Sequence, residues 1–218
     1  IVVDRETGNV TLQLGEDGNH DVIFEQHNPT YLETDDGRPV VLVADSENNR
    51  VVEYTCTAQV DGECEWERTW VVGEDQLSWP RDADRLPNGN TLITDSRNHR
   101  VIEVTPQGHI VWEAYAPWVP FSAERVVHGN DGVESPTMHD LGYSGSYPLS
   151  GTAGLTPGTE GGGVTFPEWL RTNVAPLPVV GGPARDLADL WEGGEMWVRP
   201  VWMAPWSFVF LLVGSILG

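Results

Sequence analysis

The feature that most constrains the fold is an internal repeat in the middle of the chain. The segment Ala44–Glu53 (ADSENNRVVE) recurs as Thr94–Glu103 (TDSRNHRVIE), and both follow the pattern D-S-x-N-x-R-V-[VI]-E. A second match aligns Pro80–Asn90 with Pro120–Asn130. Repeats of about 40 to 50 residues built from short β-like runs are typical of propellers and other β-arrays.

Each repeat unit divides into four strands joined by turns. In the clearest unit we expect strands at Ala83–Leu86, Thr91–Thr94, Arg100–Thr105 and His109–Ala114. The pair Asn88-Gly89 supplies positive φ at the first turn at little cost. The preceding unit has the same arrangement over residues 31–72, with a longer outer hairpin. Residues 1–14 match residues 101–114 weakly, so we expect them to form only the outer hairpin of another unit.

The expected fold is therefore all-β, with propeller blades of four-stranded antiparallel sheets forming a partial wheel over residues 1–135. Residues 136–196 are rich in Gly and Pro and are expected to be an irregular juxtamembrane region, with a linker between residues 142 and 163. Within this region, Ala184–Trp191 is expected to form a short helix with Leu187 and Leu190 on the same side as Trp191.

Residues 197–218 are expected to contain one transmembrane helix. Pro200–Gly218 carries no charged residue, and as a helix it would be about 28 Å long, close to the thickness of a bilayer core. Trp202 and Trp206 lie near its start, where an interfacial aromatic belt belongs. The alternative is a buried core helix, although such a helix is rarely apolar on all sides.

Composition narrows the function classes. The chain has 33 acidic and 12 basic residues, a net charge of −21 and no lysine. Nucleic-acid binding is disfavoured, because it needs a basic surface. A strongly negative surface keeps a protein soluble in high salt, and acidity with Arg in place of every Lys resembles proteins of extreme halophiles, notably haloarchaea. The alternative is an ordinary acidic protein.

Two cysteines lie on either side of a predicted turn. Cys56 and Cys64 flank Val60-Asp61-Gly62, so folding this hairpin places them opposite each other on adjacent strands. Opposed residues of a non-hydrogen-bonded pair have Cα atoms about 4.5 Å apart, and a disulfide needs roughly 4.4–6.8 Å. We predict a disulfide, which indicates an oxidising compartment outside the cytoplasm.

The repeated polar motif is interpreted as structural. It comprises Asp45, Asn48 and Arg50 in one unit and Asp95, Asn98 and Arg100 in the next. Asp and Asn side chains can close a tight turn through bonds to the backbone, and the Arg can tie the turn to its neighbour. A charged binding rim is the alternative. No cofactor is expected, since no strong zinc, calcium or nucleotide motif occurs.

The repeats also resemble a known family. Asn98-His99-Arg100-Val101 after Asp95 looks like the NHL-repeat propellers, and Asp82–Glu113 is still more similar to the arylsulfotransferase-type propellers of haloarchaea. The resemblance covers about residues 1–130. It implies a six-bladed wheel that transfers a sulfuryl group between phenols through a histidine in the axial channel. Several members of that family end in a membrane helix.

Sulfuryl transfer requires a nucleophile, cations for the anionic oxygens and a proton donor for the phenolate. We expect His27 as the nucleophile, Arg81 or Arg85 as the cation and Tyr31 as the proton donor. Unperturbed imidazole is largely neutral at pH 7 and so available for attack.

The position of His27 in the repeat supports this choice. His27 lies just before Pro29, which we match with Pro80, and this places it at the start of an inner strand near the channel mouth. His128 and His139 are alternative nucleophiles. Each of these histidines can also be an ordinary channel-lining or surface residue.

Two function hypotheses follow. The first is a single-pass, membrane-anchored sulfotransferase with its propeller on the extracytoplasmic side. The second is a non-catalytic propeller that acts as a binding or assembly module in a cell-envelope complex. Since propellers have four to eight blades and this chain holds only two complete ones, we expect further residues of the same polypeptide, or a partner chain, to complete the wheel. Both ends of the chain are expected to continue in a longer protein.

Overall fold

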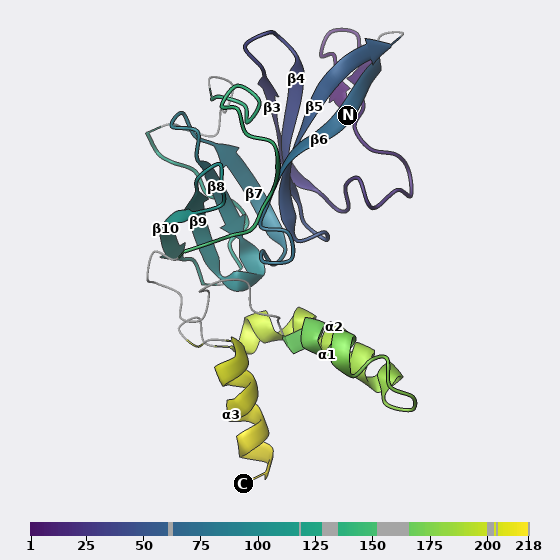
Figure 1. The fold of residues 1–218 in the computed structure, drawn as a ribbon, viewed down its shortest axis with the longest axis vertical. Helices are drawn as coiled ribbons and strands as arrows, with labels where there is room; N and C mark the ends of the chain where they lie inside the picture. The colour runs from purple at the N-terminus through teal and green to yellow at the C-terminus, as the bar shows by residue number, and fades with distance from the viewer. Residues whose placement is uncertain are drawn as a thin grey trace.

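The computed structural model describes residues 1–60, 63–117, 119–127, 135–151, 166–199, 203 and 205–217. This part of the chain consists of mainly antiparallel sheets followed by three helices (Figure 1). The strands are β1 (Val2–Val3), β2 (Val10–Leu12), β3 (His27–Glu33), β4 (Pro39–Asp45), β5 (Arg50–Val60), β6 (Glu63–Val72), β7 (Pro80–Arg85), β8 (Thr91–Asp95), β9 (Arg100–Val104), β10 (Ile110–Tyr115) and β11 (Gly145–Tyr147). The helices are α1 (Phe166–Asn173), α2 (Gly181–Val198) and α3 (Pro205–Leu217), and a 3-10 turn, η1 (Ser96–Asn98), follows β8.

Two four-stranded antiparallel meanders make up most of the β structure. The strands β3 to β6 pair in chain order, and β7 to β10 do the same. The strands expected in the second unit are confirmed, although β7 starts three residues earlier than expected, at Pro80. The first meander also starts earlier, at His27 instead of Tyr31. Within the described residues, neither sheet closes on itself.

The meanders pack against each other through one apolar face of each. Strand alternation places every second side chain on that face, and the two faces form one buried core. Its members in the first meander are Leu32, Val40, Leu42, Val51, Trp70 and Val72, and in the second Ala83, Ile93, Ile102, Val104 and Ile110. The first strand of the second meander, β7, therefore lies beside β3 and β4 (Figure 1).

Part of the expected linker instead belongs to the β structure. The strand β11 pairs in parallel with the edge strand β6, and Met138 and Leu149 are buried in the core between the meanders. The same segment also passes close to Gly108, in the turn between β9 and β10. A Cβ at Gly108 would lie 2.3 Å from the carbonyl oxygen of Pro148, so a larger residue would not fit there. Residues 152–163, the rest of the expected linker, lie outside the described residues.

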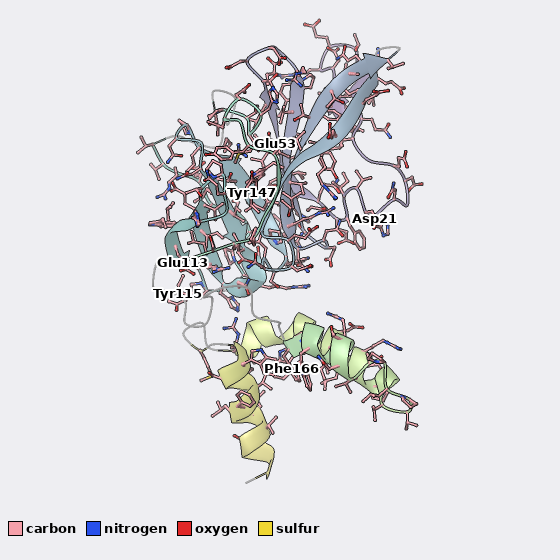
Figure 2. All side chains as sticks on the ribbon, in the orientation of Figure 1. Asp21, Glu53, Glu113, Tyr115, Tyr147 and Phe166 are labelled. Carbon is pink, nitrogen blue, oxygen red and sulfur yellow. A yellow bond between two sulfur atoms is a disulfide. The ribbon has the colours of Figure 1, made fainter. Side chains whose placement is uncertain are left out.

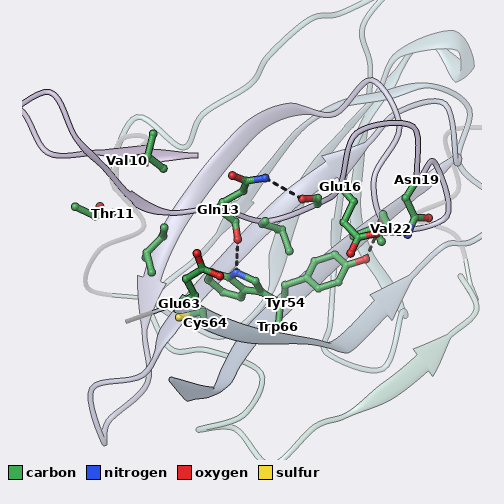
Figure 3. A pocket seen from close by; sticks show the side chains of 13 residues that line it. Val10, Thr11, Gln13, Glu16, Asn19, Val22, Tyr54, Glu63, Cys64 and Trp66 are labelled. Carbon is green, nitrogen blue, oxygen red and sulfur yellow. Dashed lines mark hydrogen bonds between the residues drawn. The ribbon is translucent and has the colours of Figure 1, made fainter. Parts of the chain in front are cut away.

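The N-terminal residues form the expected hairpin, in which β1 pairs antiparallel with β2. The chain then crosses the second face of the first meander. There the indole Nε1 of Trp66 donates to the carbonyl oxygen of Gln13 at 2.7 Å, and the Tyr54 hydroxyl donates to that of Val22 at 2.7 Å (Figure 3). A hollow of about 690 Å³ remains between residues 10–22 and the β5–β6 hairpin.

The predicted disulfide between Cys56 and Cys64 is confirmed, with Cα atoms 5.3 Å apart. The two residues are not directly opposed as expected. Cys56 pairs with Trp66, and Cys64 pairs with Gln59. The position of the hairpin turn produces this offset. Val60 pairs with Glu63, so the two strands are not aligned about residue 60, the midpoint between the two cysteines.

The C-terminal region is helical. The short helix expected at residues 184–191 is confirmed as part of the longer α2. The apolar helix α3 begins at Pro205, and Trp202 lies outside the described residues. Among the helices that the structure describes, none combines the length and the apolar character needed to cross a bilayer.

Candidate functional site

The repeated polar motif forms a hydrogen-bonded turn around one buried aspartate. In the first meander, Asp45 accepts from the Arg50 Nε at 2.8 Å, the Asn48 Nδ2 at 2.9 Å and the backbone N–H of Phe24 at 2.7 Å. The Phe24 bond ties the turn to the chain that enters β3. These contacts agree with the structural interpretation of the motif.

The second meander reproduces the same turn. Asp95 accepts from the Arg100 Nε at 2.7 Å, the Asn98 Nδ2 at 2.9 Å and the backbone N–H of Ser78 at 2.8 Å. Arg100 also bonds Glu113 on β10 at 3.2 Å. The corresponding Arg50 bonds Glu74 at 2.9 Å.

The serine of the motif links each meander to the segment that follows it. The Ser46 hydroxyl donates to the carbonyl oxygen of Pro80 at 2.6 Å, and the Ser96 hydroxyl donates to that of Pro120 at 2.7 Å. The segment around Pro120 therefore stands in the same relation to the second meander as the start of β7 does to the first. A third unit begins there.

Backbone conformation aligns the starts of these three units. Trp79 and Val119, the residues before the two prolines, have φ values of 55° and 58°, and Glu25 has a φ of 45°. Gln26, which follows Glu25, is thus the counterpart of Pro80. The sequence match of Pro29 with Pro80 was wrong by three residues, because the positive φ defines this position and a proline is not required.

In the corrected alignment, His27, Arg81 and Phe121 occupy equivalent positions on three successive units, and they meet. The Arg81 Nη1 lies 2.8 Å from the His27 Nδ1 and also contacts Nε2. The ring of Phe121 meets the His27 ring edge-on, with centroids 5.6 Å apart. The Arg81 guanidinium lies 5.3 Å from the centroid of the same Phe121 ring.

The His27 Nδ1 has two oxygen neighbours besides Arg81, which contacts both ring nitrogens. The carbonyl oxygen of Glu25 lies 3.0 Å from Nδ1, and the Ser46 hydroxyl lies 3.1 Å from it. Because Ser46 already donates to Pro80, a proton on Nδ1 is best placed to bond Glu25. The lone pair is then on Nε2, which faces Arg81.

Arg81 carries the positive charge of this cluster. Its guanidinium stacks on the Trp79 ring at 3.2 Å, and Arg97 covers the same ring at 4.5 Å. Burial lowers the pKa of Arg81, while the charges of Glu47 and Glu25 oppose that effect. The Nε of Arg81 has no hydrogen-bond partner among the described residues. A chain with a net charge of −21 thus gathers two guanidinium groups around one indole.

Arg85, the alternative cation, belongs to the core instead. Its Nη2 donates to Glu53 at 3.0 Å, and both side chains are fully buried. Figure 2 shows Glu53 in the region where the two meanders meet. The Glu53 carboxylate also accepts from the backbone N–H of Met138 at 2.9 Å. Arg85 is held away from His27 by these contacts.

Tyr31, the expected proton donor, faces away from His27. Leu32 points into the core between the meanders, so the adjacent Tyr31 lies on the opposite face of the sheet. There it lines an apolar cavity of about 160 Å³ with Val41 and Val43. Its hydroxyl donates to Glu33 at 2.9 Å, and burial raises the pKa of Tyr31 to about 12.

Of the two alternative nucleophiles, His139 is exposed and its Nε2 lies 2.6 Å from the Arg38 Nη2, apart from the His27 cluster. His128 lies outside the described residues. In the part of the chain that the structure describes, no group of three or more His, Cys, Asp or Glu side chains is arranged to hold a metal ion.

Sequence reasoning missed three members of the cluster, namely Trp79, Arg97 and Phe121. The match of Pro80 with Pro120 contained the signal for Phe121, because it aligned that residue with Arg81. Compared with known proteins, the chain matches no family model and no curated protein.

Proposed function

We propose that this chain is an arc of a β-propeller, similar to the arylsulfotransferase-type propellers, that transfers sulfuryl groups between phenolic compounds through His27. The observation that carries the proposal is the meeting of His27, Arg81 and Phe121 at one equivalent position of three successive units. A side chain repeated at the start of each inner strand is expected to surround the axis of a wheel.

The arrangement of the sheets supports the propeller. Each meander has four strands paired in chain order, as a blade has, and the first strands β3 and β7 lie side by side. The motif turns and their serine bridges recur between successive units. Repeated interfaces of this kind are typical of radial β-arrays.

The chemistry assigned to the cluster is attack on sulfur by the His27 Nε2 lone pair. The sulfur–oxygen bond to the aryl group breaks, and the electron pair leaves with the phenolate. Arg81 gives up its contact with Nε2 and donates to the sulfuryl oxygens, for which its planar fork is suited. Phe121 and Trp79 offer aromatic surfaces to the aryl group. The oxygen of a second phenol then attacks the same sulfur and loses its proton to solvent. The bond between sulfur and Nε2 breaks, and its electron pair returns to Nε2 of His27.

Two roles proposed from the sequence change in this account. Arg85 forms a buried ion pair with Glu53 in the core. Tyr31 lines a cavity on the face of the sheet that points away from this core. Arg81 therefore remains as the cation of the proposed site. Donors whose phenolate leaves without protonation are the expected substrates for a first assay.

The second candidate function is a non-catalytic module that assembles with a partner. Exposed apolar side chains at both ends of the arc favour it. Val10 is 53% exposed at one end, and Phe121 and Val126 are 57% and 93% exposed at the other. Further blades or a partner chain would cover these residues, and a scaffold needs no reactive histidine.

An extracytoplasmic, membrane-anchored location is part of the proposal. The disulfide supports an oxidising compartment, and the uncharged C-terminal segment supports attachment to lipid. The acidic composition is expected to suit high salt, which also screens the repulsion between the protein and an anionic donor.

The test is turnover of p-nitrophenyl sulfate by the complete protein in high salt, with phenol as the acceptor. We expect turnover, and a loss of at least about 100-fold in His27→Ala, as for removal of a nucleophile. His109→Ala is the matched control, because His109 bonds Ser150 outside the cluster. Absence of turnover in the intact protein would favour the scaffold. Turnover retained in His27→Ala would transfer the role to His128 or His139.

A further inference from the structure

The helices α1 and α2 form a pair with one apolar side left uncovered. Ala184 and Ala188 are buried in the pair, whereas Leu187 and Leu190 are 43% and 73% exposed, and Val198 is 66% exposed. These three exposed residues lie on the same side of α2, since positions three, four, seven and eight apart share a helix face. Asp189 lies on the other side and bonds Arg171 of α1 at 2.7 Å.

The next helix, α3, is apolar around its whole circumference. Phe210, Leu211, Leu212 and Val213 are consecutive, and their exposed fractions are 67%, 53%, 36% and 47%. Consecutive residues are separated by about 100° around a helix, so these four side chains point in every direction. A groove on a protein partner would cover one side of such a helix, whereas lipid surrounds all of it.

An aromatic cluster lies between the helix pair and α3; its member Phe166 is labelled in Figure 2. The Phe166 ring lies 4.8 Å from that of Trp191 on α2 and 5.6 Å from that of Trp206 on α3, centroid to centroid. Trp169 of α1 lies 6.1 Å from Trp206 and is 40% exposed. Trp side chains concentrate at the level of lipid headgroups, because their rings are apolar and their N–H is polar.

We propose that the α1–α2 pair lies in the headgroup region of a lipid bilayer, with Leu187, Leu190 and Val198 directed into the membrane. In this arrangement Asp189 faces water, the aromatic cluster is at the interface, and α3 continues into the hydrocarbon. This inference rests on the membrane attachment in the proposed function and adds a second, flat contact to it. A helix pair with one apolar and one charged side suits such an interfacial position.

The test uses the complete chain in phosphatidylcholine vesicles, with single cysteines labelled by the environment-sensitive fluorophore NBD. Cys56 and Cys64 remain joined in their disulfide. The variants are Leu187→Cys and Leu190→Cys, with Asp189→Cys as the matched control. Positions 187 and 189 are about 200° apart on the helix, and the exposed ion pair of Asp189 contributes little to stability.

We expect blue-shifted emission at positions 187 and 190, and quenching by lipids that carry a nitroxide near the headgroup that is at least about 3-fold stronger than at position 189. Equal quenching at all three positions would overturn the proposal. Leu212→Cys on α3, probed with lipids that carry the nitroxide along the acyl chain, separates the two ideas, because α3 is proposed to continue into the hydrocarbon. Quenching at 212 without quenching at 187 and 190 would leave α3 as an anchor but refute the interfacial pair. Absence of quenching at 212 as well would also refute membrane attachment through α3.

Discussion

Glu53 and Arg85 form a charged pair at the centre of the core between the two meanders. Both side chains are fully buried. Burial raises the pKa of Glu53 and lowers that of Arg85, and each charge opposes the effect of burial on its partner. A pair of this kind contributes little net stability as a whole, but either charge alone in the core is costly.

Arg85→Met is therefore expected to lower the free energy of unfolding by about 3–5 kcal/mol, because it leaves the Glu53 carboxylate buried without its cation. Chemical denaturation measures the loss. The double variant Glu53→Leu/Arg85→Met should recover most of it. Arg38→Met, which removes an exposed pair with Asp36, should cost less than about 1 kcal/mol. A similar cost at Arg38 and Arg85 would contradict the account.

Asp84 is the residue whose protonation should make stability depend on pH. Burial raises the pKa of Asp84 to about 7, and the charges of Asp82 and Glu124 add to the effect. The unfolded carboxyl titrates near 3.9, so the folded state binds its proton more tightly. The stabilisation is complete below about pH 4 and is lost as the pH rises through about 7.

Asp84→Asn is expected to remove this dependence. Relative to the unaltered protein, the variant should gain roughly 1–3 kcal/mol of unfolding free energy by pH 8, since it no longer buries a charge. Denaturation at pH 4, 6 and 8 measures the difference. Parallel stability curves for the two proteins would show that Asp84 does not titrate in this range.

Sequence reasoning identified His27 and Arg81 one at a time, but it did not show that they meet. Their contact depends on the corrected alignment of Gln26 with Pro80, which a positive φ at the preceding residue defines. Many residue types can occupy the positions of Gln26 and Pro80, so comparison of the sequence alone matched Pro80 with Pro29. Tyr31 was expected to act beside His27, but a register shift between His27 and Thr30 changes which side chains share a side of the sheet.

At the scale of elements, the internal repeat and the turns within it were enough to predict four strands in each meander. The segment 135–151 was harder, because its Gly and Ser content is typical of linkers. Its buried residues Met138 and Leu149 are far apart in sequence from the strands they contact. Long-range packing of this kind leaves no periodic signal.

The Cys56–Cys64 disulfide stabilises the outer part of the β5–β6 hairpin. Cys56→Ser/Cys64→Ser should lower the free energy of unfolding by about 2 kcal/mol, as expected for a short closed loop. Hydrogen exchange should accelerate at the exposed outer residues of β5, such as Ala58 and Gln59, while β4 is unaffected. Unchanged stability, or free thiols in the unreduced protein, would contradict this prediction.

At the scale of the whole molecule, the first meander presents an apolar face where, in the proposed propeller, a preceding blade would pack. Tyr31, Val41 and Val43 line a cavity on this face, and residues 1–23 cover it only in part. We expect further strands, from the same polypeptide or a partner, to complete the contact. A complete structure in which residues 1–130 form a closed domain without such strands would refute this expectation.

Tyr31→Arg tests the same face in the assembled protein. Although Tyr31 is 38% exposed here, the substitution should cost at least about 2 kcal/mol in the complete wheel, because it would bury a charge between blades. Val111→Arg on β10 is the control, as Val111 is 51% exposed on an outer strand and should change stability by less than about 0.5 kcal/mol. Equal effects would mean that no blade covers Tyr31.

The central claim is that His27 carries a sulfuryl group during the reaction. The most direct measurement is mass spectrometry of peptides from the complete protein, quenched after a brief exposure to p-nitrophenyl sulfate without acceptor. We predict a sulfuryl adduct on the peptide that contains His27, lost on addition of phenol and absent in His27→Ala. Release of p-nitrophenol with an adduct on His128 or His139, or with no adduct on any histidine, would contradict the account.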